Sequence, residues 1–378
     1  MSSLLDRLPD INFAQKDTTI IEAEVIARFE GVLGRRLFPG DPWRLILTTF
    51  VYYLSLQRNN IDFAGKQNLL RYSGDGFLQH IAALVGAEQL PPASAVTTLE
   101  FTLTTPLPSI TTIRKGTRTT PGNRIYFATS QDAEIPAGEL TVAVNAVCTE
   151  AGEIGNGFLP GQVNQISDPF PYHCTVINTT PTQGGADLES LEALRARTQI
   201  APESYSTAGP YGAYEYWAKT ASQLVVDVTV KSPEPGVVEI VPLLKGGEIP
   251  TQSLLDDVYA VCNDDTRRPL TDKVVVRAPD TVVYGVDLTF YVARRDAVNG
   301  LNLQNKVTEA VEAFILWQKS KLGRDINPSK LVEMIKATGV KRVDMDNLAP
   351  AYQPLDYYQL AVADMGDIKV VYGGLEDD

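Results

Sequence analysis

The sequence predicts an α+β protein built from several domains. In the first 90 residues, apolar side chains recur every three or four positions, which is typical of helices. After the turn-forming stretch PPAS at 91–94 the period of the apolar pattern changes to two, which is typical of strands. Strand-like and helical stretches then alternate to the end. With 378 residues, 44% of them hydrophobic, the chain is long enough for about two to three domains with cores of their own.

These patterns predict an order of domains. We expect a helical N-terminal region over 1–90, an antiparallel β domain over 91–183 and two linking helices over 184–222. An α+β sandwich domain over 223–300 and a C-terminal α/β segment of helices and short strands over 301–378 follow.

The N-terminal region contains a strong helix start in GDPWRLILTTFVYYLSLQRNN. Asp41 can cap this helix and Pro42 stands at its first position. Such a helix carries an apolar stripe, which either packs in a core within the chain or forms a bundle with helices of another chain. Both interpretations stay open from the sequence. The stripe, a candidate partner interface, comprises Trp43, Leu47, Phe50 and Leu54.

The β domain is predicted by runs such as TTLEFTLTTPL, NRIYFATS and ELTVAVNAV. They are rich in Thr, Val and aromatic residues and are separated by Gly and Pro turns. We therefore expect successive antiparallel strands.

The stretch TQGGADLESLEALRAR follows that domain. Gly184 and Gly185 turn the chain, and Asp187 is expected to accept hydrogen bonds from the amides that open the next helix. One interpretation is an ordinary capped linker. The other is a candidate inter-domain hinge, made by these three residues, that sets the angle between the two sheet domains.

The later domains show mixed signals. QLVVDVTVKSPEPGVVEIVPLL predicts a hairpin, SLLDDVYAVCND a helix, and KVVVRAPDTVVYGVDLTFYVAR two strands. A long helix is predicted in NLQNKVTEAVEAFILWQKSKLG, and another begins at Asn327 and Pro328. Short strands are expected in VKRVDM and IKVVYG.

Motifs for catalysis or metal binding are missing from the sequence. His80 and His173 are isolated, with no HExxH, and no serine sits in GxSxG. GNGFLPG lacks the GxGxxG spacing, and VDMDNLA lacks the glycine and glutamate of a calcium loop. Asp264 and Asp265 are adjacent acids beside two arginines, which indicates a solvated loop. We expect no catalytic residue, no cofactor and no bound metal.

The charge, the apolar runs and the cysteines of the sequence argue against several further classes of protein. The net charge of -13 argues against nucleic-acid binding, which needs clustered Lys and Arg. The most apolar run, at 43–56, is shorter than the roughly 20 residues that span a bilayer. The N-terminus lacks a basic segment followed by an apolar one, so we expect synthesis in the cytoplasm without export. Three separated cysteines form no CxxC pair.

Several strings together resemble the baseplate J-like family of contractile phage tails and related injection systems. They are AEIPAGELTVAVNAVCTEAGEIGN, GGADLESLEALRAR, STAGPYGAYEYWAKTASQ with VTVKSPEPGVVEIV, and the later TRRPLTDKVVV and GRDINPSKLVEMIKATGVKRV. The resemblance covers residues 95–345.

The resemblance implies a non-enzymatic wedge protein of the tail baseplate. Members occur as paired copies, link wedges into a ring around the tail hub, and rearrange on contraction. Their N-terminal helices bundle with a second wedge protein, and a sheath-initiator-like small wedge protein and hub proteins are neighbours. Two alternatives stay open: a tail adhesin that binds host glycan, and a cell-wall polysaccharide hydrolase that would use unpaired acids.

Overall fold

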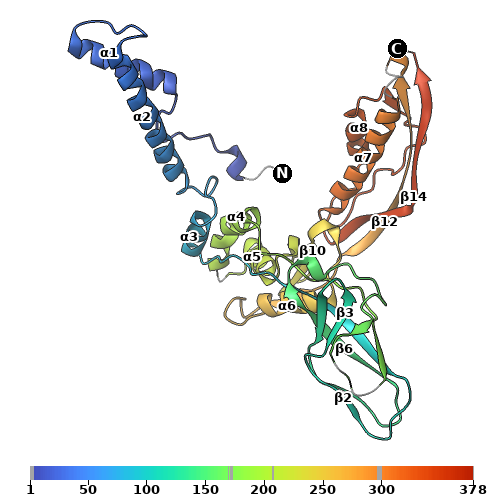
Figure 1. Ribbon diagram of the computed structural model, residues 1–378. Helices are drawn as coiled ribbons and strands as arrows, with labels where there is room; N and C mark the ends of the chain where they lie inside the picture. The colour runs from blue at the N-terminus through green and yellow to red at the C-terminus, as the bar shows by residue number, and fades with distance from the viewer. Residues whose placement is uncertain (1–3, 169, 171–172, 207, 296–299, 378) are drawn as a thin grey trace. The chain divides into compact units, whose positions relative to one another are not determined.

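The structure, a computed structural model, describes residues 4–168, 170, 173–206, 208–295 and 300–377. It is a multidomain α+β protein, as the sequence predicts (Figure 1). The chain divides into two compact units. Unit 1 comprises Met1–Gln89 and Ser190–Ala201, and unit 2 comprises Leu90–Glu189 and Pro202–Asp378.

Unit 1 is helical. After a short 3-10 turn at Leu4–Arg7 it contains α1 (Thr18–Leu33), α2 (Pro42–Lys66), α3 (Phe77–Leu84) and α4 (Leu191–Ile200). The predicted start of α2 is confirmed, because the Asp41 side chain accepts from the amide of Trp43 and Pro42 opens the helix. Helices α1 and α2 pack against each other over a small core formed by Ile21, Leu37, Leu47 and Val51.

Helix α4 completes unit 1 although about 100 residues separate it from α3 in the sequence. The Arg195 guanidinium donates to the carbonyls of Leu70 (2.8 Å) and Ser73 (2.5 Å), and Arg197 donates to the carbonyl of Glu88. Leu194 is fully buried. Of the two helices expected over 184–222, α4 therefore lies in unit 1, whereas the second, α5 (Tyr211–Ala221), lies in unit 2.

Unit 2 begins with a nearly closed antiparallel barrel. The Asn178 side-chain oxygen accepts from the backbone amide of Val163 (2.9 Å), and the Asn178 backbone amide donates to the Val163 carbonyl (3.2 Å), which joins the last strand to the residues just before the strand at the other end of the sheet. A two-stranded sheet of β2 (Thr111–Ile113) and β5 (Ala133–Ile135) lies beside the main one. The main sheet has the order β7 (Gln165–Ile166), β3 (Arg118–Gly122), β4 (Ile125–Thr129), β6 (Thr141–Ala151), β1 (Ser94–Leu103) and β8 (Cys174–Asn178).

A three-stranded sheet follows the barrel. The predicted hairpin is confirmed as β9 (Val225–Lys231) and β10 (Val237–Leu244), which pair antiparallel. Helix α6 (Gln252–Cys262) then leads to β11 (Lys273–Val276), which runs parallel to β10. Helix α5 packs against β9 and α6.

The last domain pairs β12 (Asp280–Ala293) with β14 (Gln359–Glu376) in parallel, with β13 (Arg342–Val343) on the other side of β12. Helices α7 (Gly300–Lys319) and α8 (Pro328–Lys336) lie beside this sheet (Figure 1) and share its core. The expectation of a short strand in IKVVYG is corrected, because these residues belong to an 18-residue strand. Two irregular stretches within β14 hide its continuity in the sequence.

Candidate partner interface

Helix α2 exposes apolar side chains on more than one side. At 100° per residue, Leu47, Val51 and Ser55 form the buried side. Two exposed rows lie away from it. Stripe A comprises Trp43, Ile46, Phe50, Leu54 and Ile61, and stripe B comprises Leu45, Tyr52, Leu56 and Phe63, and every one of these side chains is between 41% and 63% exposed.

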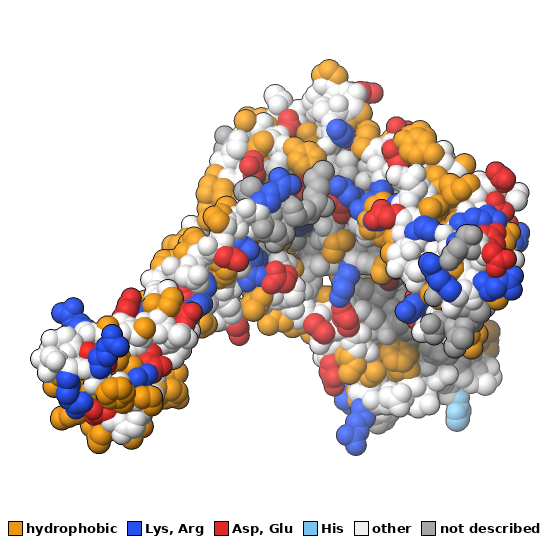
Figure 2. Space-filling view, turned by 90° about the horizontal axis from the view of Figure 1, so that it is seen from above, with side chains coloured by type: hydrophobic (Ala, Val, Ile, Leu, Met, Phe, Trp, Pro, Cys, Tyr) orange, Lys and Arg blue, Asp and Glu red, His pale blue; other side chains and the backbone are white. Residues whose placement is uncertain are grey.

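The two stripes lie about 160–200° apart around the helix axis, because Trp43 and Leu45 differ by two positions and the spacing then repeats at three, four or seven residues. Figure 2 shows the hydrophobic side chains of this helical hairpin at the left of the view. A helix that is apolar nearly all round is normally enclosed by other helices. Within the described residues of unit 1, α1 and the N-terminal segment cover the buried side of α2.

The structure divides the residues that the sequence grouped as one stripe. Trp43, Phe50 and Leu54 are 51%, 60% and 41% exposed and belong to stripe A. Leu47 is only 9% exposed and belongs to the buried side. Leu47 lies 60° from Phe50 around the helix axis. A small rotation of the helix therefore determines whether Leu47 is buried against α1 or exposed with Phe50. Sequence reasoning missed stripe B, whose signal is the unusual density of apolar residues over 43–63.

An extended segment, residues 8–17, runs along the second half of α2 and is called the N-terminal strap. Its anchor is Asp62, a residue only 4% exposed, which accepts from the Lys16 ammonium (2.7 Å), the Lys66 ammonium (2.9 Å) and the Phe13 amide (2.9 Å). The hydrogen bond from Lys16 and then those from Lys66 and Phe13 hold the pKa of this carboxyl well below its usual range.

The strap also depends on a close contact. A Cβ atom on Gly65 would lie 2.5 Å from the ring of Phe13, so only glycine allows the ring to lie against the helix there. Leu8, Ile11 and Phe13 remain 40–48% exposed and extend the apolar surface of unit 1.

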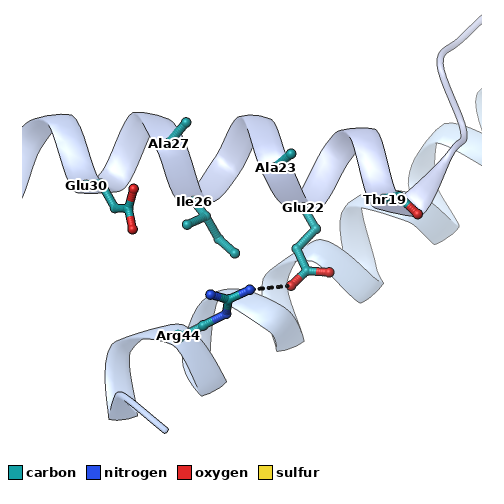
Figure 3. Close-up of a pocket in the computed structure, with 7 residues that line it drawn as sticks. All are labelled: Thr19, Glu22, Ala23, Ile26, Ala27, Glu30 and Arg44. Atoms are coloured by element: carbon teal, nitrogen blue, oxygen red, sulfur yellow. Dashed lines mark ion pairs between the residues drawn. The ribbon is translucent and has the colours of Figure 1, made fainter. Parts of the chain in front are cut away.

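A cleft of about 310 Å³ lies between α1 and the start of α2 (Figure 3). Arg44 from α2 reaches Glu22 on α1 at 3.6 Å across it. Ala23, Ile26 and Ala27 supply apolar wall. Thr19 and Glu30 complete the lining, and no described hydrogen bond joins the Thr19 hydroxyl to either carboxylate of the cleft.

The glycine segment of unit 2 is held firmly to the barrel. The Gly185 amide donates to the Asn156 side chain (2.9 Å), which donates back to the Gly185 carbonyl (2.8 Å). A Cβ atom on Gly185 would lie 2.4 Å from the Gly152 carbonyl oxygen. Gly184 has a φ of +88°, which favours glycine.

The expectation that Asp187 caps the following helix is wrong. Its carboxylate accepts from the amide of Glu153 (3.0 Å), three residues before Asn156 in the barrel. The cap of α4 is Ser190, whose hydroxyl accepts from the Ala193 amide (3.2 Å). Both residue types favour caps, so the sequence alone could not choose between them.

No group of three or more His, Cys, Asp or Glu suited to a metal occurs in the part of the chain that the structure describes. Asp264 accepts from both the amide and the hydroxyl of Thr266, and Asp265 pairs with Arg268 at 2.8 Å. These contacts agree with a solvated loop.

Among the described helices, none combines the length and hydropathy needed to cross a bilayer.

Three family models match the chain in succession. They describe the baseplate J-like protein barrel domain (residues 98–185), the baseplate J-like central domain (206–278) and the baseplate J-like protein C-terminal domain (286–371). The chain belongs to the baseplate J-like family. The three matches fall on the barrel, the three-stranded sheet with its helices, and the β12–β14 domain, so the family covers unit 2 and leaves the stripes of α2 outside the matched residues.

Baseplate protein J of Escherichia phage P2 is 31% identical over 181 residues, which cover 46% of this chain and 59% of that protein. The match thus spans about three fifths of that relative's length. A solved structure titled "Cryo-EM structure of the anti-feeding prophage (AFP) baseplate, 6-fold symmetrised" contains a chain that aligns over 91% of this chain and 90% of its own, with 12% identity and a TM-score of 0.42. That TM-score does not establish a common fold across the whole chain.

Proposed function

We propose that the chain is a structural protein of a contractile-tail baseplate, with no enzymatic activity. Membership of the baseplate J-like family and the relative named baseplate protein J support this function. The single structural observation that carries it is the pair of exposed apolar stripes on α2, because a surface of that kind forms contacts between proteins.

The stripes call for helical partners. Their apolar residues repeat at three, four and seven positions, the spacing at which one helix packs along another. Since stripes A and B lie on nearly opposite sides of α2, one partner helix cannot cover both. We infer that the N-terminal helices form a bundle with a second wedge protein and with a second copy of this chain.

The remaining partners follow from the same function. Copies of the chain would pair within and between wedges, and a sheath-initiator-like small wedge protein and tail hub proteins would be their neighbours. The protein would reside in the virion at the tail baseplate after synthesis in the host cytoplasm. Its acidic surface, with a net charge of -13, would keep free subunits apart until complementary partners arrive.

The segment formed by Gly184, Gly185 and Asp187 has a mechanical role in this proposal. Its bonds to Asn156 and Glu153 fix the direction in which the chain leaves the barrel. A hinge at this segment would have to break those bonds, whereas a fixed exit would keep them through contraction. Normal tail assembly by a Gly185→Val variant would exclude both roles.

The proposed function is tested by deleting the gene and supplying variants from a plasmid. We expect the deletion to stop production of complete tails. An Ile46→Ser/Phe50→Ser double variant should be soluble but fail to restore them, because stripe A loses two large apolar side chains. Asn60→Ala is the matched control, since it changes an exposed polar residue of the same helix. Full restoration by the double variant would contradict the interface, and complete tails from the deletion strain would contradict the baseplate function.

A further inference from the structure

The last strand of the protein has an open edge. In the sheet order β13-β12-β14, β14 pairs with β12 on one side, and no other described strand lies on its outer side. The backbone groups on that outer side therefore lack ladder partners within the described residues. Helices α7 and α8 share the core on a face of the sheet and do not close this edge.

The regular part of this edge is the stretch Ile368–Tyr372. It pairs residue for residue with Val286–Phe290 of β12. On either side the register shifts, at residues 364–367 and again at 373–374. Three of its five residues are β-branched, and Val371 and Tyr372 are 48% and 37% exposed. The stretch is regular in its pairing, mostly apolar and about 16 Å long at the usual rise per residue.

An edge of this kind is a template for another strand. Soluble proteins usually block such edges with charges, proline or bulges, or cover them. The register shifts here flank the regular stretch without interrupting it. Its one charged residue, Lys369, lies 3.9 Å from Asp287 and 3.8 Å from Asp367 in two exposed ion pairs, so its charge is partly compensated within the sheet. The unblocked edge indicates that a strand from outside the chain covers it.

Charge selects the kind of strand. Asp287, Asp364 and Asp367 stand near one end of the stretch, and Lys369 compensates one charge of the three. Asp364 makes no ion pair within the described residues, and its carboxylate accepts only from the amide of Gly366 (2.9 Å). A second copy would bring another chain of net charge -13 to this acidic end. A basic segment would instead be attracted to it.

We propose that Ile368–Tyr372 of β14 accept an added strand from a different polypeptide, one that places Lys or Arg beside Asp364 and Asp367. The added strand continues the sheet through backbone hydrogen bonds, and the cations of the partner set its register. This inference rests on the proposed function, which makes the partner another protein of the tail baseplate.

The test places a photo-reactive phenylalanine analogue at Val371 in the full chain and irradiates purified tails. Leu316, 53% exposed on α7, is the matched control position in the same domain. We expect position 371, and not position 316, to cross-link to an extended segment of another tail protein that has a Lys or Arg within a few residues. An Asp364→Asn/Asp367→Asn variant should lower the yield about fivefold, the loss expected when two exposed ion pairs are removed.

Three results would overturn the proposal. They are no cross-link at position 371, a cross-link to β14 of a second copy, and a cross-linking yield that is unchanged in the Asp364→Asn/Asp367→Asn variant. Mass spectrometry of the same tails separates this failure from a wrong function. If the chain is present in tails and position 371 does not cross-link, the edge proposal alone is wrong. If the chain is absent from tails, the baseplate function is wrong and the edge proposal falls with it.

Discussion

Leu47 and Phe50 provide the sharpest test of the interface because they are three residues apart on one helix and face different surroundings. Leu47 is 9% exposed and belongs to the buried side of α2, whereas Phe50 is 60% exposed in stripe A. Both are changed to alanine, the best helix former, so helix propensity does not oppose either substitution. Their consequences should separate cleanly between folding and assembly.

For Leu47→Ala we expect the free energy of unfolding of unit 1 to fall by about 2–3 kcal/mol, near the low end for a core leucine because the α1–α2 contact is close to the surface. For Phe50→Ala the free energy of unfolding of the free chain should fall less, by about 1 kcal/mol, because only two fifths of this side chain is covered there. Urea unfolding followed by circular dichroism measures both values.

Assembly should respond in the opposite order. An aromatic side chain buries about 200 Å², so the exposed three fifths of Phe50 leave about 120 Å² for a partner to cover. At about 25 cal/mol per Å² this contributes about 3 kcal/mol, or about a 100-fold loss of affinity in Phe50→Ala. Titration with the co-expressed bundling wedge protein, followed by sedimentation velocity, measures the loss. Equal destabilisation of the free chain by both substitutions, or unchanged affinity of Phe50→Ala, would refute the reasoning.

Three further predictions concern contacts within the units. The pKa of Asp62 is lowered in the folded state, so the ionised carboxylate stabilises unit 1 above the unfolded pKa near 3.9, and this stabilisation is lost as the pH falls. The urea midpoint of unit 1 should therefore drop between pH 6 and pH 3, and it should drop less in the Asp62→Asn variant. Gly185→Ala should destabilise the barrel by about 1–3 kcal/mol because its Cβ would meet the Gly152 carbonyl oxygen, and a thermal melt that matches the wild type would exclude this clash. Arg195→Ala should speed hydrogen exchange in α4 because its two bonds to the carbonyls of Leu70 and Ser73 are lost, and unchanged exchange would show that those bonds do not hold the helix.

Local signals in the sequence predicted much of the fold. Asp41 with Pro42, and Asn327 with Pro328, begin helices because capping depends on residues within one turn. The hairpin of β9 and β10 likewise follows from alternation around a turn at Gly236. These features need no information about distant parts of the chain.

Contacts between residues far apart in the sequence were not predicted. Nothing local tells that α4 completes the helical unit, because its bonds to Leu70 and Ser73 reach back more than 120 residues. Asp187 is a suitable cap by residue type, yet a barrel amide takes its carboxylate. The strap depends in the same way on Asp62, which lies 49 residues from Phe13.

The interface was predicted in part for a geometric reason. Four apolar residues define the direction of a helix face only approximately. Leu47 lies at the border between the buried side and the exposed stripe, and the structure places it on the buried side. Stripe B was missed because a search for one amphipathic face stops at the first face it finds. The density of apolar residues in α2 indicates two faces once exposure is known.

The most direct test of the baseplate function is a cryo-electron microscopy map of purified contractile tails from the source of this chain. We predict baseplate density that fits the barrel, the three-stranded sheet and the β12–β14 domain, together with an N-terminal α2 surrounded by helices of other chains. A well-resolved baseplate with every density assigned to other proteins would contradict it.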